Sequence, residues 1–500
     1  MPEHRGISER VTVEYDPLYL ETHYVAQFEE EMSYRFHPLL RIHLAWTAML
    51  AEQQIIPHES AVELCEALCA LEKEKPQVLL PYVPAYGDVY VHMEKYLVGQ
   101  IGEEHVGHLA LARTRPEPIG RMVLRERLLK VIDASLTLRQ NILDTAERHV
   151  ETVMPGYTHH QPAQPTTLGH YLMAIYEPVA EDTASMEHAF DVVNRCSLGC
   201  GALAGTAFPI DRERVADLLG FDGVYENTYA CVSSTDYLLK STNSFVSTLV
   251  TLSRLAQDFN EWCSQDIRIM LTAPQFSGVS SLMPQKYNPT VLEILRFHSS
   301  HGVELAHSAL KVPMKSNYAD VREVDRAWMP TFTALDNAAD TIRLFGGVIE
   351  SMTIYQDKML ELARNNFSTV SELADEIYRQ TGLPYRTAHA IVVRVVNQAL
   401  DQGLAPFDIT SDMLTAAADK VIGQPLRISQ EAISRALDPV AFVESHDVLG
   451  GPAPREVRRM IDVRRERLAE AQKRQAVRKA RLEQGNKLLD EAVHKIIAST

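Results

Sequence analysis

The 500-residue chain has the composition of an ordinary globular protein, with 46% hydrophobic and 23% charged residues, which excludes disorder of the whole chain. Its 49 Lys and Arg against 66 Asp and Glu give a formal net charge of -17. This charge argues against a broad nucleic-acid-binding surface but permits a local cationic pocket for a small anion. No apolar run is long enough for a membrane span, and the start lacks the apolar core of a signal peptide. We therefore expect a cytoplasmic protein that does not act on nucleic acid or membranes.

The six cysteines are too sparse for a disulfide scaffold. Cys65 and Cys69, and also Cys196 and Cys200, are four residues apart, but no companion His or Cys stands at ligand spacing. We expect buried free thiols and no metal site. The sequence also contains no Gly-rich phosphate loop in a βαβ context, so we expect no nucleotide cofactor.

Gly and Pro are distributed unevenly, which indicates where long helices lie. Neither residue occurs between Gly120 and Pro155 or between Gly223 and Pro274, so each interval predicts a long helix or helix pair. In the second interval, apolar residues repeat at alternating spacings of four and three, a stripe that packs helix against helix. The sequence therefore predicts a bundle, one that subunits can share. The stripe consists of Phe245, Leu249, Leu252, Ala256 and Phe259.

Strand signals are weak, so we expect an all-α fold. From Asn366 onward, Gly and Pro break the chain into shorter helices, which indicates a separate C-terminal lobe. The last segment is rich in Arg, Lys and Glu, and we expect a solvated rim helix or a partly frayed tail. The expected domains are an N-terminal helical domain at 1–119, a central bundle at 120–365, a C-terminal helical domain at 366–465 and the charged segment at 466–500.

Two stretches carry residues that bind anions or move protons. In Arg113-Thr114-Arg115, two guanidinium groups flank a hydroxyl, which suits a carboxylate, although surface arginines at a helix start are the commoner explanation. Residues 156–167 contain two prolines and paired Gln, which predict an extended loop. His159 in this loop can titrate near neutrality, but a structural histidine is an equally good explanation.

The third stretch, residues 277–289, is the most specific. It places two hydroxyls, an ammonium and an amide in a loop that begins at Gly278 and is closed by two prolines. Serine is too weak an acid to serve as a base unless preorganised donors hold its alkoxide. Lys286, Asn288 and backbone amides are candidates for those donors of Ser280. A polar loop without chemistry explains any one of these residues but not the whole set.

The third stretch, Ser-Ser-Leu-Met-Pro-Gln-Lys-Tyr-Asn, closely resembles the Ser-Ser-x-Met-Pro-x-Lys-x-Asn loop of the fumarase/aspartase/argininosuccinate lyase superfamily. Its Pro-Gln before the lysine is similar to the argininosuccinate lyase branch. Residues 156–165 resemble the Gly-Tyr-Thr-His-x-Gln-x-Ala-Gln-Pro of the same family. The resemblance runs from about residue 20 to about residue 465, with further matches at 201–206, 209–212, 373–375, 383–389, 437–439 and 450–454.

The resemblance implies a homotetramer around a long central bundle, with four active sites that are each built from three subunits. It also implies a small-molecule substrate from which a Cβ proton is removed, an aci-carboxylate forms, and the Cα substituent leaves to give fumarate, without a metal, nucleotide or organic cofactor. Ser280 is the implied base, supported by Lys286 and Asn288, and His159 assists proton transfer to the leaving nitrogen. The expected catalytic residues are Ser280, His159 and Lys286; the expected substrate-binding residues are Thr158, Ser281, Asn288, Met283, Arg113, Arg115, Thr114, Gln161, His43, Asn317 and Arg322.

The departures from the family pattern fall mainly among the residues expected to bind the amine half of the substrate. Pro116 follows Arg115 where argininosuccinate lyases have Asn, and it supplies neither an amide side chain nor a backbone donor. His43 stands in the place of a pocket serine. The family's Tyr, Gln and Lys that handle the arginine portion become Asn317, Arg322 and Asp325. The fumarate-side loops are therefore kept, whereas the amine-side pocket changes its charge.

We therefore expect a carbon-nitrogen lyase that acts on an N-substituted aspartate other than argininosuccinate. Arg322 is a candidate for an anionic group on the amine half, and Asp325 or Glu323 for a cation. One alternative is a true argininosuccinate lyase. A second is a non-catalytic tetramer like the crystallins recruited from this family, against which the intact Ser280 and its neighbours argue.

Overall fold

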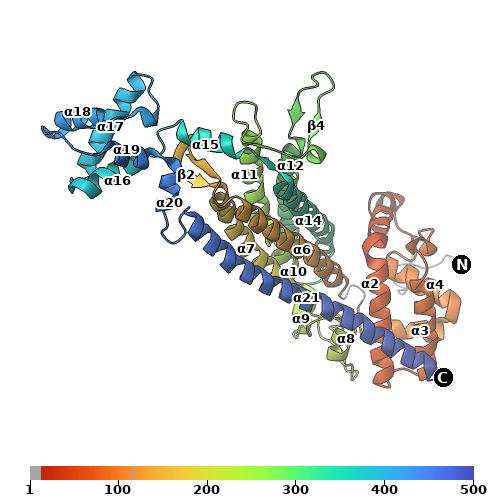
Figure 1. The fold of residues 1–500 in the computed structure, drawn as a ribbon. Helices are drawn as coiled ribbons and strands as arrows, with labels where there is room; N and C mark the ends of the chain where they lie inside the picture. The colour runs from red at the N-terminus through yellow and green to blue at the C-terminus, as the bar shows by residue number, and fades with distance from the viewer. Residues whose placement is uncertain (1–12, 115–117, 500) are drawn as a thin grey trace.

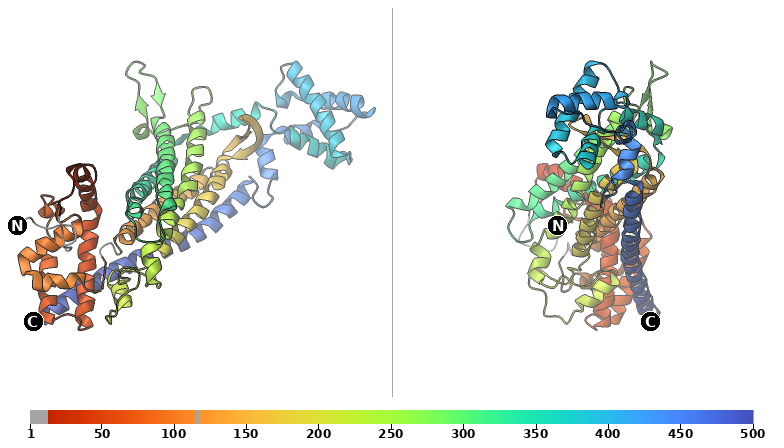
Figure 2. Two further views of the ribbon diagram at one scale, coloured as in Figure 1. Left: turned by 180° about the vertical axis from the view of Figure 1, so that it is seen from behind. Right: turned by 60° about the vertical axis from the view of Figure 1, so that its left-hand side comes forward.

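A computed structural model describes residues 13–114 and 118–499 of the chain. The molecule is elongated, with an N-terminal helical domain at one end, a long helical bundle in the middle and a small C-terminal helical domain at the other end (Figures 1 and 2). The C-terminus returns along the bundle and ends beside the N-terminal domain. Among the described residues, no helix is long and apolar enough to cross a lipid bilayer.

The N-terminal domain is organised around helix α2. From Leu39 to Leu50 nearly every α2 side chain is buried, including His43 and Thr47. A helix that is apolar on all sides must be covered on all sides, and α3, α4 and the end of α21 do this. Asp88 caps α4 by accepting a hydrogen bond from the amide of Val91 at 3.0 Å. The elements are α1 (Pro17–Tyr19), the π-helical turn η1 (Leu20–Tyr24), α2 (Val25–Glu52), α3 (His58–Glu72), η2 (Pro76–Leu79), α4 (Val89–Ile101), α5 (Glu103–Val106) and η3 (Gly107–Ala110).

The bundle contains the longest stretches of buried apolar surface. The residues of the predicted stripe, Phe245 to Phe259, are all fully buried, which confirms a helix packed against helices. The interval without Gly and Pro is not one helix, however: it divides into α9, α10 and α11, and α11 begins only after Phe245. The bundle helices are α6 (Ile119–Arg148), α7 (Leu168–Val193), α8 (Arg212–Leu218), α9 (Thr228–Ser233), α10 (Asp236–Asn243), α11 (Val246–Trp262), α12 (Thr290–Lys311), η5 (Val312–Lys315), α13 (Arg322–Asp325) and α14 (Trp328–Ser351).

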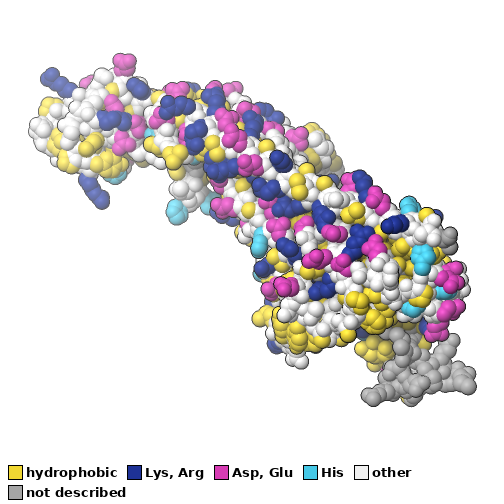
Figure 3. Space-filling model, turned by 90° about the horizontal axis from the view of Figure 1, so that it is seen from below, with side chains coloured by type: hydrophobic (Ala, Val, Ile, Leu, Met, Phe, Trp, Pro, Cys, Tyr) yellow, Lys and Arg dark blue, Asp and Glu magenta, His cyan; other side chains and the backbone are white. Residues whose placement is uncertain are grey.

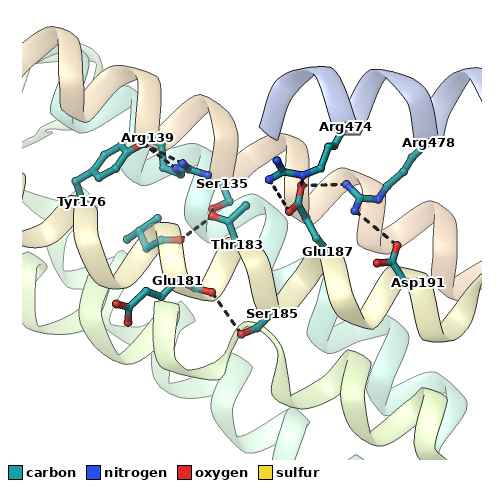
Figure 4. Close-up of polar contacts among 11 residues, drawn as sticks. Ser135, Arg139, Tyr176, Glu181, Thr183, Ser185, Glu187, Asp191, Arg474 and Arg478 are labelled. Carbon is teal, nitrogen blue, oxygen red and sulfur yellow. Dashed lines mark hydrogen bonds and ion pairs between the residues drawn. The ribbon is translucent and has the colours of Figure 1, made fainter. Parts of the chain in front are cut away.

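The charged C-terminal segment is part of a single helix, α21 (Pro454–Ala498), that lies along α6 and α7 and reaches α2 and α3. Glu187 of α7 is buried and pairs with Arg474 at 3.0 Å and Arg478 at 3.0 Å (Figure 4). Gln475 is also buried and donates to the carbonyl of Leu129. Cationic and anionic side chains alternate over this face of the molecule (Figure 3). The segment is therefore a helix and not a frayed tail: some of its Arg pair with carboxylates of the bundle, while most of its other charged side chains are exposed.

The C-terminal domain has its own small core, built around Leu373, Ile391, Leu414 and Ile433. Gly382 and Gly423 end two of its helices in the left-handed conformation, which explains the regular Gly breaks in the sequence. Its helices are α15 (Gln356–Arg364), α16 (Val370–Thr381), α17 (Tyr385–Asp401), η6 (Pro406–Asp408), α18 (Ser411–Ile422), α19 (Gln430–Leu437) and α20 (Pro439–Ser445), of which α15 connects it to the bundle.

The expectation of an all-α fold is confirmed, because the described strands form only three two-stranded antiparallel ribbons. Two of the ribbons carry sequence motifs. The pairs are β1 (Val153–Thr158) with β2 (Gln161–Thr167), β3 (Met270–Leu271) with β6 (Thr353–Ile354), and β4 (Gly278–Val279) with β5 (Tyr287–Asn288), the short turn η4 (Pro274–Phe276) preceding β4.

Candidate active site

The Ser-Ser motif lies at the tip of an arm formed by β4 and β5, which projects beyond the N-terminal end of α12 (Figure 1). Ser280 Oγ accepts a hydrogen bond from the amide of Met283 at 3.0 Å and a longer one from the amide of Leu282 at 3.4 Å. These two donors favour a negative charge on that oxygen. Ser281, Met283 and Lys286 are exposed, and Leu282 is 86% exposed. The tip of the arm therefore exposes both polar and apolar groups to solvent.

The base of the arm is fixed by neighbouring hydroxyls. Tyr287 donates its phenolic hydrogen to the carbonyl of Thr272 at 2.7 Å, and Ser277 contacts the hydroxyl of Thr272 at 2.7 Å. Gly278 approaches Thr290 so closely that a Cβ at this position would lie 2.7 Å from the Thr290 methyl carbon. Asn288, on β5, is half-buried. The arm thus leaves the bundle in a defined direction while its tip stays exposed.

The second motif forms a β-hairpin, not the extended loop that the two prolines suggested. β1 and β2 pair through Thr158 and Gln161, and His159 and His160 are the two residues of the turn. Both histidines have positive φ, 55° and 59°, which a two-residue hairpin turn requires but which histidine adopts at a cost. Prolines are tolerated because a two-stranded ribbon has only edge strands. His160 Nδ1 lies 3.6 Å from a carboxylate oxygen of Glu261, while Thr158, His159 and Gln161 are exposed at the tip.

The first motif lies between the N-terminal domain and the bundle. Arg113 contacts Nδ1 of the fully buried His43 at 3.3 Å through Nη1, and its guanidinium carbon lies 5.6 Å from the centre of the Tyr90 ring. Burial, with the Arg113 charge beside it, holds the pKa of His43 well below its ordinary value, so this histidine is neutral. Among the described residues, Arg113 Nε and Nη2 are buried and have no hydrogen-bond partner. This edge of the guanidinium is the one that binds a carboxylate with two parallel hydrogen bonds. Arg115 lies outside the described residues.

Thr114 lines a narrow cavity of about 60 Å³ at the same junction. The opposite wall comes from the segment that differs from the family pattern, through Asp320, Val324 and Asp325. The cavity therefore brings together Thr114 and Asp325, which are far apart in the sequence. Its other lining residues are Pro118, Gly120, Arg121, Ser197, Cys231, Val232, Ser234, Tyr237 and Trp328.

The two charged residues of this segment have different surroundings. Burial raises the pKa of Asp325, although the charges of Arg35 and Arg322 oppose the shift. Arg322 is half exposed and lies 3.8 Å from the Asp325 carboxylate, whereas Asn317 is exposed. The cavity thus has an acidic wall and a cationic group at its edge.

A single chain does not bring the three motifs together. The β4–β5 arm extends past α12, the β1–β2 hairpin lies against α15 and α20, and Thr114 lies toward the N-terminal domain (Figures 1 and 2). Arg322 reaches this junction only through its contact with Asp325, and Asn317 is not among the residues that line the cavity. In the described chain, the three motifs are therefore separate from one another.

Several residues of the cavity carry no signal in the sequence. Cys231, Tyr237 and Arg121 lie on helices that contain no recognisable motif, and only tertiary packing places them beside Thr114. Asp325 was identified from its altered charge alone. The part of the chain that the structure describes contains no cluster of three or more His, Cys, Asp or Glu side chains suited to a metal ion.

Comparison with known proteins agrees with the sequence motifs. Residues 14–301 match a family described as lyase, and residues 367–444 match the C-terminal region of argininosuccinate lyase. The chain is 34% identical to an argininosuccinate lyase from Methanothermobacter thermautotrophicus over 87% of this chain and 94% of that protein. It is also 34% identical to the argininosuccinate lyase of Methanocaldococcus jannaschii, over 85% of this chain and 87% of the relative.

Among solved structures, a variant of EDDS lyase with bound fumarate is similar to this chain, with a TM-score of 0.85. The two chains are 29% identical, and the match covers 98% of this chain and 97% of the other. A class II fumarase from Schistosoma mansoni, 15% identical with a TM-score of 0.65, shares the fold. The match to EDDS lyase includes the whole length of the bundle and both flanking domains.

Proposed function

Because the chain belongs to the argininosuccinate lyase-like branch of the fumarase/aspartase superfamily, and is therefore a carbon-nitrogen lyase, we propose that it eliminates an amine other than arginine from an N-substituted aspartate and releases fumarate. The observation that carries the proposal is the cavity that joins Thr114, of the fumarate-side motif, to Asp325, of the altered segment. Fumarate-side chemistry is retained in this chain, and the charge change falls on the wall that faces the amine.

In the proposed reaction, Ser280 removes the Cβ proton of the succinyl group. The amides of Met283 and Leu282 stabilise the charge on its Oγ, and Lys286 adds a positive charge from the same arm. Removal of the proton gives an aci-carboxylate, whose collapse breaks the Cα–N bond and leaves fumarate. His159 supplies a proton to the departing nitrogen. We assign the carboxylates of the succinyl half to Thr158, Ser281 and Asn288 with the free guanidinium edge of Arg113.

The amine half is assigned to the cavity. A carboxylate at Asp325 favours a cationic group deep in the pocket, and Arg322 at the rim favours an anionic group farther out. The proposed substrate is therefore an N-substituted aspartate. Besides the nitrogen that leaves, its amine half carries a cationic group and an acidic group. The similar fumarate-bound structure is of an enzyme named EDDS lyase and not argininosuccinate lyase, which supports a substrate other than argininosuccinate.

True argininosuccinate lyase is the second candidate, because the curated relatives at 34% identity carry that activity. The two candidates are separated by running the reaction in reverse. Purified protein is supplied with fumarate and one amine at a time, and the loss of fumarate absorbance is followed. We expect amino acids and diamines with an acidic group to react faster than arginine. If arginine is the best partner, the altered-pocket proposal is wrong; if no amine consumes fumarate, the elimination itself is wrong.

We also propose a homotetramer that completes each site with motifs from three subunits. The separation of the motifs supports this, as do large apolar side chains exposed on the bundle, such as Val250, Ile294 and Phe297, the last 63% exposed. Mixing two inactive variants tests it. If Ser280 and His159 of one site come from different subunits, randomly mixed S280A and H159N chains should regain about a quarter of the wild-type activity, because one site in four receives both intact residues. If mixing restores no activity, the two residues act within one chain.

A further inference from the structure

Cys231 differs from a buried structural thiol in its contacts. It lies on α9 and lines the cavity beside Thr114 and Asp325. Its Sγ accepts a hydrogen bond from Nη2 of Arg212 at 3.4 Å, and in the neutral form donates to the carbonyl of Tyr225 at 3.0 Å. The side chain of Cys200 also hydrogen-bonds to it. Two thiols and a guanidinium therefore meet at one wall of the cavity.

The charge state of Cys231 follows from these contacts. The hydrogen bond from Cys200, with the nearby charges of Arg212 and Arg121, lowers the pKa of Cys231 to about 7. Burial instead raises the pKa of Cys65 to about 12 and that of Cys263 to about 11. The lowered pKa favours the thiolate of Cys231, the form that reacts with electrophiles. Cys231 is a free thiol, as expected, but it is only half-buried.

Cys200 begins a short loop in which Gly201, Leu203 and Gly205 all have positive φ. Cys200 and Gly201 are buried, whereas Ala202 and Ala204 are exposed. The carbonyl of Cys200 accepts a hydrogen bond from the amide of Gly205. Arg212 anchors the far side by donating to the carbonyls of Leu198 and Tyr225. A short displacement of this loop brings Cys200 from hydrogen-bond contact to the roughly 2.05 Å of a disulfide.

We propose that Cys231 and Cys200 form a peroxide-reactive thiol pair whose disulfide closes the amine side of the cavity. In the first step, the Cys231 thiolate attacks one oxygen of hydrogen peroxide and the O–O bond breaks. Cys231 becomes a sulfenic acid, and hydroxide is the leaving group. In the second step, the Cys200 sulfur displaces the sulfenic oxygen, which leaves as water with the thiol proton. Two electrons pass from the two thiols to the peroxide, and a dithiol reductant reverses the change.

The disulfide affects substrate binding because of where α9 lies. Cys231, Val232 and Ser234 form one wall of the cavity, and Asp325 lies on another. A bond from Cys231 to the 200–205 loop pulls that wall toward the loop. It also removes the thiolate that faces the guanidinium of Arg212. We expect the amine half to lose its fit, and turnover to fall, while the helices of the bundle stay in place.

Formation of the Cys200–Cys231 disulfide is tested by treating the full-length protein with hydrogen peroxide in the absence of substrate. After free thiols are alkylated with N-ethylmaleimide, trypsin gives peptides 196–212 and 215–240, since cleavage sites flank both and lie within neither. We expect these peptides to be linked, and fragmentation to place the bond at Cys200 and not at Cys196. Absence of the link, or a bond to Cys196, overturns the proposal.

Single substitutions distinguish the roles of Cys231 and Cys200. C231S should abolish the link and slow peroxide consumption. C200S should stop the reaction at the sulfenic acid of Cys231, which dimedone traps. C69S is the matched control, because burial raises the pKa of the half-buried Cys69, and it should behave as wild type. In the reduced protein at pH 7, iodoacetamide should label Cys231 at least about tenfold faster than Cys65 or Cys263. Equal labelling rates contradict the thiolate assignment.

The effect on turnover rests on the proposed function, whereas bridge formation does not, so the two can fail separately. With an amine that the enzyme accepts, peroxide should lower the fumarate-consuming activity of wild type and C69S, and dithiothreitol should restore it. C231S, whatever its activity in the reduced state, should lose no further activity when peroxide is added. If the disulfide forms and activity is unchanged, the closing of the cavity is wrong.

Discussion

The amide nitrogen of Met283 lies 3.0 Å from the Oγ of Ser280, three residues earlier in the same exposed arm. The hydroxyl that we propose as the base therefore receives its strongest donor from its own chain. Both donors to Ser280 follow it directly in the sequence, so the turn between the two serines and Pro284 fixes their geometry. If the proposed tetramer forms, its assembly has to position the arm but not to build the environment of the base.

Replacing Ser280 by alanine removes the proposed base and leaves the arm otherwise intact. We expect turnover to fall by about 10²- to 10⁴-fold, the usual contribution of a general base. Fumarate release measures the loss, and size-exclusion chromatography checks that assembly is unchanged. S300A, on the exposed side of α12, is the control and should keep wild-type activity. Substantial turnover by a well-assembled S280A protein would show that another group takes the proton.

The local sequence pattern correctly predicted those structural features that depend only on residues close together in the chain. The stripe from Phe245 to Phe259 is a helical face because spacing alone determines which side chains share a face. The amide donors of Ser280 are also local. The Thr114 to Asp325 cavity was not predictable, because it depends on how the N-terminal domain meets α13.

The sequence pattern was misleading in two places for physical reasons. Residues 156–167 read as an extended loop because prolines usually exclude a strand from a sheet, but a two-stranded ribbon leaves their nitrogens at an edge. The C-terminal segment read as a solvated or frayed helix because it is rich in charge. Its partners, such as Glu187, lie nearly 300 positions earlier, so its packing could not be read locally.

Neutralising Asp325 tests the acidic wall of the amine pocket. In D325N, the amide keeps the size of the side chain but not its charge, so a cationic amine half should bind less well. We expect KM for the amine in the reverse reaction to rise by about tenfold, equivalent to about 1.4 kcal/mol, with a smaller change in kcat. E323Q, which neutralises the exposed neighbour, is the matched control. If E323Q raises KM and D325N does not, the cation faces Glu323 instead.

Glu456 should make stability depend on pH. Hydrogen bonds from Arg459 and from the amide of Gly450 lower the pKa of this carboxyl to about 2 from an ordinary value of 4.5. A lowered folded-state pKa stabilises the fold above the unfolded-state pKa, and this contribution is lost as the pH falls from about 4.5 toward 2. E456Q should therefore lower the Tm at pH 7, and the difference from wild type should shrink at pH 3. E466Q, which neutralises an exposed residue of α21, should show no such pH-dependent difference.

Gly485 marks the closest approach of α21 to the bundle. A Cβ at this position would overlap the backbone nitrogen and Cα of Gly220, and backbone atoms cannot rotate away as a side chain would. G485A should therefore lower the free energy of unfolding by roughly 1–3 kcal/mol, even though alanine favours helix over glycine. Chemical denaturation measures the change.

The matched control is Gly99, which also lies within a helix, α4, and where an added Cβ would meet no atom within 4 Å. G99A should gain up to about 1 kcal/mol, because alanine loses less backbone entropy in a helix and meets nothing. The two substitutions are chemically identical, so opposite signs isolate the contact with Gly220 from helix propensity. If G485A is as stabilising as G99A, α21 does not lie against Gly220, and the path of the helix back to the N-terminal domain is different.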